Sequence, residues 1–326
     1  MKKIKTLAAA FGALSMAVLG TAAHAQNYPD RPVTMIVPWA PGGAADIIAR
    51  LVAEPMGKLL GQPVVIENRP GAGGTVGSAV VAKADPDGYT ILMGNVASEA
   101  IAPAFYADTI PYKVLEDFAP VTQLIQQPSV LLVSKDSKFD NVKDLMAFAK
   151  ENPGELYATP GVGNSPYLTF ELIKDNYGVE MENVPYDSGA EVNNALNAGD
   201  VQIAINNLPE AIKAIQAGIA KPLAVTAAER NPLLPDVPTF VESGGEKIVA
   251  ISWQGIFAPA GTPDAIVQKL YEATAAALKD ENVVQRNKEL GSVPVGSTPE
   301  EFKAFVASEI ENWAYMVKLA GASAPK

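Results

Sequence analysis

Short apolar runs alternate with stretches of helical apolar spacing along almost the whole chain, and this alternation restricts the fold more than any other feature. The runs 33–37, 64–66 and 89–93 predict strands, and the apolar residues between 47 and 60 recur on one helix face. Strands that alternate with helices at these distances predict a mainly parallel sheet covered on both faces. Pro55 lies inside the first helical stretch and is expected to kink that helix or end its regular hydrogen bonding.

The alternation continues toward the C-terminus. A helix is predicted from 74 to 84. Further strands are predicted at 130–133, 156–158, 201–205, 222–225 and 251–257. Further helices are predicted at 141–150, 166–177, 209–217, 264–278 and 299–319. This is more strands than one sheet holds comfortably, and 326 residues suffice for two domains of about 150 residues each. The sequence therefore predicts two α/β lobes.

The first 25 residues have the pattern of a secretory signal peptide. Lys2, Lys3 and Lys5 precede an apolar run over 7–23, and Ala23-His24-Ala25 gives a small-residue cleavage site. The alternative is a membrane anchor, but the apolar run is short for the roughly 20 residues that a spanning helix needs. We expect residues 1–25 to be removed and the mature protein to reside in the periplasm.

Composition excludes several classes of function. The chain has no Cys, and its single His is His24, which would leave with the signal peptide. Disulfide scaffolds, thiolate zinc sites and Cys nucleophiles are excluded, and an enzyme would need Ser–Lys, paired-carboxylate or Tyr chemistry. Removal of residues 1–25 would change the net charge from −11 to −14, so no basic surface indicates nucleic acid. No metal or cofactor is expected.

Two glycine loops join predicted strands to predicted helices. One is Pro41-Gly42-Gly43-Ala44-Ala45-Asp46, and the other is Gly161-Val162-Gly163-Asn164-Ser165-Pro166. The first N–H groups of a helix lack intrahelical partners and attract anions. Each loop could equally be an ordinary tight connection. Because the two fall in different lobes, together they favour a carboxylate clamp at a cleft.

Other motifs remain open to two interpretations. The segment 71–77 imitates a dinucleotide-binding loop, but Val76 stands at the third glycine position, which favours a structural loop. Trp39 is either a core residue or a lid over a ligand. Asn206 and Asn207 end a predicted strand, where side chains reach the crevice of an α/β sheet, or they cap the following loop.

Several segments together resemble one family closely. They are 37–46 (VPWAPGGAAD), 62–74 (QPVVIENRPGAGG), 86–90 (PDGYT), 184–186, 206–209, 223–229, 234–239 and 257–263 (FAPAGTP). From about Tyr28 to its end, the chain resembles the Bug-type periplasmic receptors of tripartite tricarboxylate transporters. The resemblance implies a type II-like two-lobed periplasmic binding protein, with a small carboxylated ligand between α/β lobes that close by hinge motion.

The resemblance also implies where the ligand binds. Trp39 would pack over it, and the backbone near Gly43 and Ala44 would grip one carboxylate together with the loop containing Gly161, Gly163, Asn164 and Ser165. The far end of the ligand would meet Asn95, Ser98, Asp187, and Asn206 or Asn207. We expect a first lobe of residues 26–124 plus 251–326 and a second lobe of residues 125–250.

The chain departs from the family pattern at several of these positions. Ala44 and Ala45 replace the usual hydroxyl residues, and Asp187 stands where Lys is common. An Asp that faces the cleft would repel a second carboxylate. The hypothesis is therefore a monocarboxylate, or a ligand with a polar or amino far end, in preference to a citrate-like tricarboxylate.

The implied partners are the integral membrane subunits of the transporter, with the receptor acting as a monomer. One alternative is a ligand sensor that docks on a signalling kinase, which would differ in partner but not in pocket. The other is a periplasmic hydrolase, although the chain has neither a G-x-S-x-G nor an S-x-x-K motif.

Overall fold

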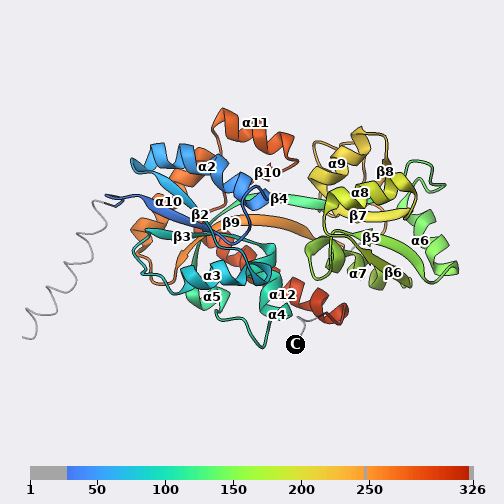
Figure 1. Ribbon diagram of the computed structural model, residues 1–326, viewed down its shortest axis with the longest axis horizontal. Helices are drawn as coiled ribbons and strands as arrows, with labels where there is room; N and C mark the ends of the chain where they lie inside the picture. Colours follow the sequence, from blue (N-terminus) through green and yellow to red (C-terminus); the bar gives the residue numbers. More distant parts are fainter. Residues whose placement is uncertain (1–27, 246–247, 323–326) are drawn as a thin grey trace, which may run out of the picture.

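Two long antiparallel strands, β4 (Phe118–Ser134) and β9 (Ile251–Pro259), connect the two lobes of the protein (Figure 1). The computed structural model describes residues 28–245 and 248–322, so the predicted signal peptide lies outside the described residues. β4 pairs with β9 through Pro128, and from Ser129 onward it pairs with strands of the other lobe. The lobes therefore share one hydrogen-bonded sheet of ten strands.

The first lobe is drawn on the left of Figure 1. Its parallel strands lie in the order β2-β1-β3, next to antiparallel β9 and β4. The strands are β1 (Val33–Val37), β2 (Val64–Asn68), β3 (Thr90–Asn95) and the short β10 (Val293–Pro294). The helices are α2 (Ala44–Leu60), the 3-10 turn Ala72–Gly74, α3 (Thr75–Ala82), the π-helical turn Ala97–Ile101, α4 (Ala102–Phe105), α5 (Val114–Asp117), α10 (Asp264–Ala277), α11 (Glu281–Glu289) and α12 (Pro299–Leu319).

The second lobe has the parallel strands β7-β5-β6, and β4 runs antiparallel to both β7 and β8. Its strands are β5 (Glu155–Thr159), β6 (Met181–Pro185), β7 (Ile203–Asn207) and β8 (Ala220–Val225). Its helices are α6 (Val142–Glu151), α7 (Ser165–Tyr177), α8 (Gly189–Ala198) and α9 (Leu208–Gln216). The predicted two-lobed α/β fold with mainly parallel sheets is confirmed.

Helix α2 shows how the sequence fixes a local element. Ile48, Val52 and Met56 recur at helical spacing and are fully buried against α10 and the sheet. Gly61 ends the helix in the left-handed conformation, with φ +77°. The expectation at Pro55 is a kink or an end to regular hydrogen bonding; α2 continues through Pro55 to Leu60, so the helix does not end there. An interior proline lacks the N–H for one helical hydrogen bond and its ring crowds the carbonyl four residues earlier, and burial of the apolar face outweighs that cost.

Helix α12 packs on the face of the first-lobe sheet opposite to α2 and α10. The Glu309 carboxylate accepts hydrogen bonds from the indole N–H of Trp253 on β9 and of Trp313 on α12, each at 2.9 Å. α12 also packs against α7 of the second lobe. Within residues 28–245 and 248–322, no helix is both long and apolar enough to cross a membrane.

Candidate functional site

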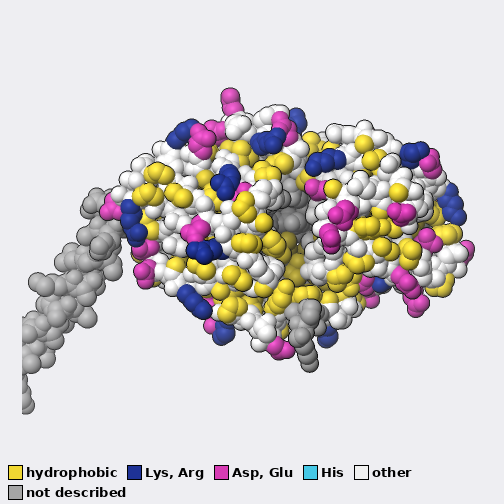
Figure 2. Space-filling view, viewed as in Figure 1, with side chains coloured by type: hydrophobic (Ala, Val, Ile, Leu, Met, Phe, Trp, Pro, Cys, Tyr) yellow, Lys and Arg dark blue, Asp and Glu magenta, His cyan; other side chains and the backbone are white. Residues whose placement is uncertain are grey.

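The strand directions bring the loops of both lobes to one junction. β3 ends at Asn95, which pairs with Gln254 of β9, and β7 ends at Asn207, which pairs with Ser129 of β4. Gln254 also pairs with Ile125, four residues before Ser129 on β4, so the two strand ends lie about 13 Å apart along that strand. Figure 2 shows the surface hollowed between the two lobes.

The first lobe contributes Trp39 and the start of α2. Trp39 is half-buried, and its ring packs where Gly74 leaves room: a Cβ on Gly74 would lie 3.2 Å from the ring and 2.9 Å from the Ser98 Cβ. The N-cap of α2 is Gly43, which has no side chain to occupy the first helical N–H groups, and its own N–H donates to Ala40 O at 3.3 Å. The first N–H groups of a helix have no intrahelical acceptor, so the start of α2 offers backbone donors to an anion.

Asn95 and Ser98 lie directly behind this loop. The Asn95 side-chain oxygen accepts hydrogen bonds from the N–H groups of Ala97 and Ser98, at 3.0 and 3.2 Å. Ser98 is fully buried, and its hydroxyl contacts Asn95. In this conformation Ser98 therefore shapes the wall of the site, and only the half-buried Asn95 presents polar atoms outward.

The second lobe contributes the glycine loop and the start of α7. Asn164 caps α7 by accepting from Tyr167 N at 3.1 Å, and its amide donates to Pro160 O at 2.5 Å. Gly161 and Gly163 have φ values of +116° and +74°, which favour glycine. A Cβ on Gly163 would lie 2.7 Å from the Phe105 ring of α4, so this loop reaches across to the first lobe. Ser165 is buried at the helix start.

Asn206 and Asn207 occupy different environments. Asn206 is fully buried, where its amide donates to Gly189 O at 2.9 Å and its oxygen accepts from Asn207 N at 3.0 Å. It supports the start of α8. Asn207 is half-buried and carries a buried side-chain oxygen without a hydrogen-bond partner among the described residues. Of the two residues, Asn207 is therefore the one with polar capacity left for a ligand.

Acidic side chains gather at the start of α8. Asp187 is exposed, and its N–H donates to the Glu191 carboxylate at 3.1 Å. The Glu210 Cγ lies 2.7 Å from where a Cβ on Gly189 would stand, so a third carboxylate borders the same turn. Figure 2 shows acidic side chains on the right-hand lobe beside the hollow. Asp187, Glu191 and Glu210 therefore place negative charge around the start of α8.

Unpaired buried polar atoms mark several of the predicted residues. Among the described residues, Trp39 Nε1, Ser165 Oγ and Asn207 Oδ1 are buried without a hydrogen-bond partner. Such atoms are uncommon because each costs about 1–3 kcal/mol. Three of the sequence-predicted residues, from both lobes, thus have atoms that a bound polar solute could satisfy.

Sequence reasoning did not single out several residues that shape this junction. Ser129 Oγ and Gln254 Oε1, on the two connecting strands, are also buried and unpaired within the described part of the chain. Asp46 is 3% exposed at the start of α2, where its hydrogen bond with Arg50 lowers its pKa to about 2. Asp46 lies inside the first glycine motif, so the motif could have indicated it. For Ser129 and Gln254 the sequence carries no comparable signal.

Glu99 is a buried carboxyl next to the site. Its side chain is fully buried below Ser98, and Ser78 Oγ donates to it at 2.7 Å. Burial raises the pKa of Glu99 to about 7, against the opposing hydrogen bonds of Ser78 and Ser98. The protonation of this group therefore changes near neutral pH.

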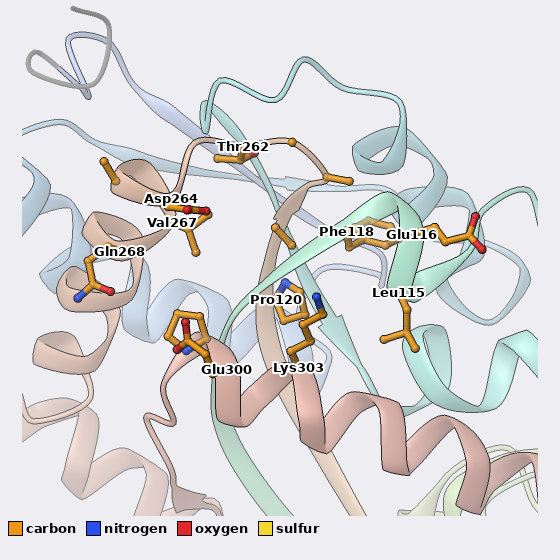
Figure 3. A pocket seen from close by; sticks show the side chains of 15 residues that line it. Leu115, Glu116, Phe118, Pro120, Thr262, Asp264, Val267, Gln268, Glu300 and Lys303 are labelled. Carbon is orange, nitrogen blue, oxygen red and sulfur yellow. The ribbon is translucent and has the colours of Figure 1, made fainter. Parts of the chain in front are cut away.

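A separate cavity of about 770 Å³ lies elsewhere on the first lobe, where α10 and α12 begin (Figure 3). Phe118, Pro120 and Lys303 are among the residues that line it, and none of the predicted binding residues does. This cavity therefore does not coincide with the candidate site. Among the described residues, no cluster of three or more Asp, Glu, His or Cys side chains is arranged to hold a metal ion.

Comparison with known proteins places the chain among receptors of this architecture. Residues 48–321 match the sequence profile described as "Tripartite tricarboxylate transporter family receptor". Three solved structures are similar over their whole length. The periplasmic binding protein BugD is 35% identical, with a TM-score of 0.74, over 91% of this chain and 99% of that one.

Two of these structures contain carboxylates. Rpa4515 of R. palustris, solved with adipate, is 36% identical with a TM-score of 0.77, over 91% of this chain and 99% of that one. MatC of Rhodopseudomonas palustris, solved with bound malate, is 34% identical with a TM-score of 0.74, over 89% of this chain and 100% of that one. These matches agree with the resemblance read from the sequence motifs. The chain belongs to the receptor family of the tripartite tricarboxylate transporters.

Proposed function

We propose that this protein is a periplasmic receptor that captures a small carboxylate between its lobes and delivers it to the membrane subunits of a tripartite transporter. The observation that carries this proposal is the set of buried, unpaired atoms on Trp39, Ser165 and Asn207, which belong to loops of both lobes that meet at the connecting strands. Adipate and malate in the related structures support a carboxylate as the chemical class.

The proposed binding geometry follows from the two helix starts. One carboxylate of the solute accepts hydrogen bonds from the uncapped N–H groups of α2 and from Ser165 at the start of α7. The Trp39 indole covers the solute and donates through Nε1. Asn95 and Asn207 meet its far end, while Ser98 and Asn206 hold the surrounding backbone.

The acidic rim refines the solute class. Asp187, Glu191 and Glu210 border the far end, and a second carboxylate there would be repelled. We therefore propose a monocarboxylate, or a carboxylate with a polar or amino far end, in preference to a tricarboxylate. Titration calorimetry tests this with malate, adipate, citrate and amino acids; tight citrate binding that Asp187→Lys does not strengthen contradicts the rim's role.

The wider assignment rests on the family and the sequence. We propose residues 1–25 as a cleavable signal peptide, residues 26–124 plus 251–326 and residues 125–250 as the two lobes, and a monomer as the working form. N-terminal sequencing of secreted protein, the mass of the species in solution and co-purification with the transporter's membrane subunits test these points separately.

Native mass spectrometry of the purified chain tests the central proposal. A bound small carboxylate, released unchanged on denaturation, is the expected result. Turnover of the solute would contradict a receptor without catalytic function. A Trp39→Ala variant is the matched sample and should lose the bound species, since it lacks both the lid and its donor.

A further inference from the structure

We infer that Asp46 and Asn68 form a positioning pair that holds the Trp39–Gly43 loop in the shape needed for solute binding, a role that rests on the proposed function. Neither residue is among the predicted solute contacts. Asp46 lies in the first turn of α2, and Asn68 is the last residue of β2, paired with Val37 at the end of β1.

Each member of the pair fastens one end of the loop. The Asp46 carboxylate accepts from Gly42 N at 2.9 Å, and the Asn68 amide donates to Trp39 O at 3.0 Å. The same Asn68 amide donates to the other Asp46 oxygen at 2.9 Å, which joins the two attachments. Ala40 through Gly43 are otherwise exposed, so these bonds are what fixes the backbone that carries Trp39.

Arg50 makes a carboxylate tolerable at this position. A negative charge at the start of α2 would compete with a carboxylate solute for the helix N–H groups. Arg50 Nε and Nη2 lie 3.0 and 2.9 Å from the two Asp46 oxygens, and Nη2 also donates to Asn68 Oδ1 at 3.1 Å. Both Asp46 oxygens are therefore occupied by donors from its own network, and the helix N–H groups stay free for a solute.

The test uses the full-length chain and a signal from Trp39. Trp253 and Trp313 are 0% and 1% exposed, so acrylamide quenching reports mainly on half-buried Trp39, and Trp39→Phe gives the background. Asp46→Ala and Asn68→Ala should each raise Trp39 quenching about threefold and speed amide exchange at Gly42 about tenfold. The double variant should exceed neither single variant, since both release the same loop.

Glu54→Gln is the matched control. It breaks the exposed i,i+4 pair with Lys58 on the same helix and touches no part of the loop, so quenching and exchange should equal those of the parent. Unchanged quenching in Asp46→Ala and Asn68→Ala would overturn the inference. So would equal acceleration of exchange across 48–56, because the pair would then merely stabilise α2.

A binding arm separates this inference from the proposed function. With nicotinate and neutral amino acids as probes beside malate and adipate, Asp46→Ala should weaken about tenfold the binding of each compound that the parent binds, while Glu54→Gln stays within about twofold of the parent. The acrylamide quenching of Trp39 and the amide exchange at Gly42 are measured without any solute. A parent chain that bound no carboxylate would therefore overturn the proposed function, while those two measurements would still decide the role of the pair.

Discussion

The two glycine loops meet the same junction but are held in different ways. In the first lobe the loop before α2 is held by hydrogen bonds to Asp46 and Asn68, which lie beyond the loop itself. Its N-cap is Gly43, which makes no side-chain hydrogen bond to the helix N–H groups. In the second lobe the loop before α7 is fastened from within, because Asn164 both caps the helix and holds Pro160 O. The first helix thus offers backbone donors, whereas the second offers mainly the Ser165 hydroxyl.

The comparison explains why the starts of α2 and α7 would contribute unequally to an anion site. A side-chain cap stabilises a helix but occupies the donors that an anion needs. Where the cap is glycine, another part of the protein must fix the loop. We therefore expect α2 to contribute most of the carboxylate affinity and the loop before α7 to contribute most of the local stability.

The largest effect is expected from a pair of glycine variants, one per loop. Gly163→Ala places a Cβ 2.7 Å from Phe105 at φ +74°, whereas Gly42→Ala, at φ +83°, meets nothing within 4 Å. The backbone strain costs about 1–2 kcal/mol in both, and overpacking adds about 1–3 kcal/mol in Gly163→Ala. Urea unfolding should show the larger loss for Gly163→Ala, with partial recovery in the Phe105→Ala background. Equal losses of unfolding free energy in the two variants would mean that the contact between Gly163 and Phe105 does not contribute to stability.

Asn164→Ala should cost about 1–2 kcal/mol of unfolding free energy, because it removes the cap on Tyr167 N and the bond to Pro160 O. The corresponding variant in the first loop is Gly43→Ser, whose backbone angles suit a side-chain cap (φ −73°, ψ 167°). It should change the unfolding free energy by only about 0.3 kcal/mol. It should lower carboxylate affinity, because the serine hydroxyl would occupy a helix N–H group. Thermal unfolding and calorimetry check both. A stability loss in Gly43→Ser, or none in Asn164→Ala, would contradict the contrast.

Ser165→Ala should separate affinity from stability. Its buried hydroxyl has no hydrogen-bond partner among the described residues, so removal should not lower stability and should raise it by up to about 1–3 kcal/mol. Affinity for the carboxylate that copurifies with the chain should fall about tenfold, the equivalent of about 1.4 kcal/mol. Unchanged affinity would remove Ser165 from the proposed site.

The smallest effect concerns pH. Because hydrogen bonding to Arg50 lowers the pKa of Asp46 to about 2, its stabilisation is present above the ordinary value of 3.8 and is lost only as pH falls through about 2. Trp39 emission should therefore be flat from about pH 8 down to about pH 3, below the ordinary carboxyl value. The measurement belongs in a Glu99→Gln background, because burial raises the pKa of Glu99 to about 7. A transition near pH 3.8 that Asp46→Asn abolishes would show that Asp46 is not held as described.

Sequence reasoning predicted the elements with strong periodicity and missed those without it. Helices α2 and α12 have the predicted bounds, since their apolar spacing and terminal Gly and Pro residues are clear. β4 was predicted only at 130–133, because Pro120, Pro128 and the glutamines between them break the apolar pattern of its first half. The polar helix α11 and the small-residue helix α8 were not predicted for the same reason.

The candidate site was predictable in its loops but not in its contacts. Glycines between strand and helix indicated both loops, and their positions in different lobes favoured a cleft between them. Whether Asn206 or Asn207 retains polar capacity depends on packing against Gly189, and the roles of Ser129 and Gln254 depend on the register of β4 with β7 and β9. These are properties of the tertiary structure that local sequence does not encode.

A crystal structure of the protein with its copurified carboxylate tests the account most directly. The solute's carboxylate should sit between the start of α2 and Ser165, under the Trp39 indole and beside the two connecting strands. A solute bound away from both helix starts, for example in the cavity beside Lys303, would contradict it.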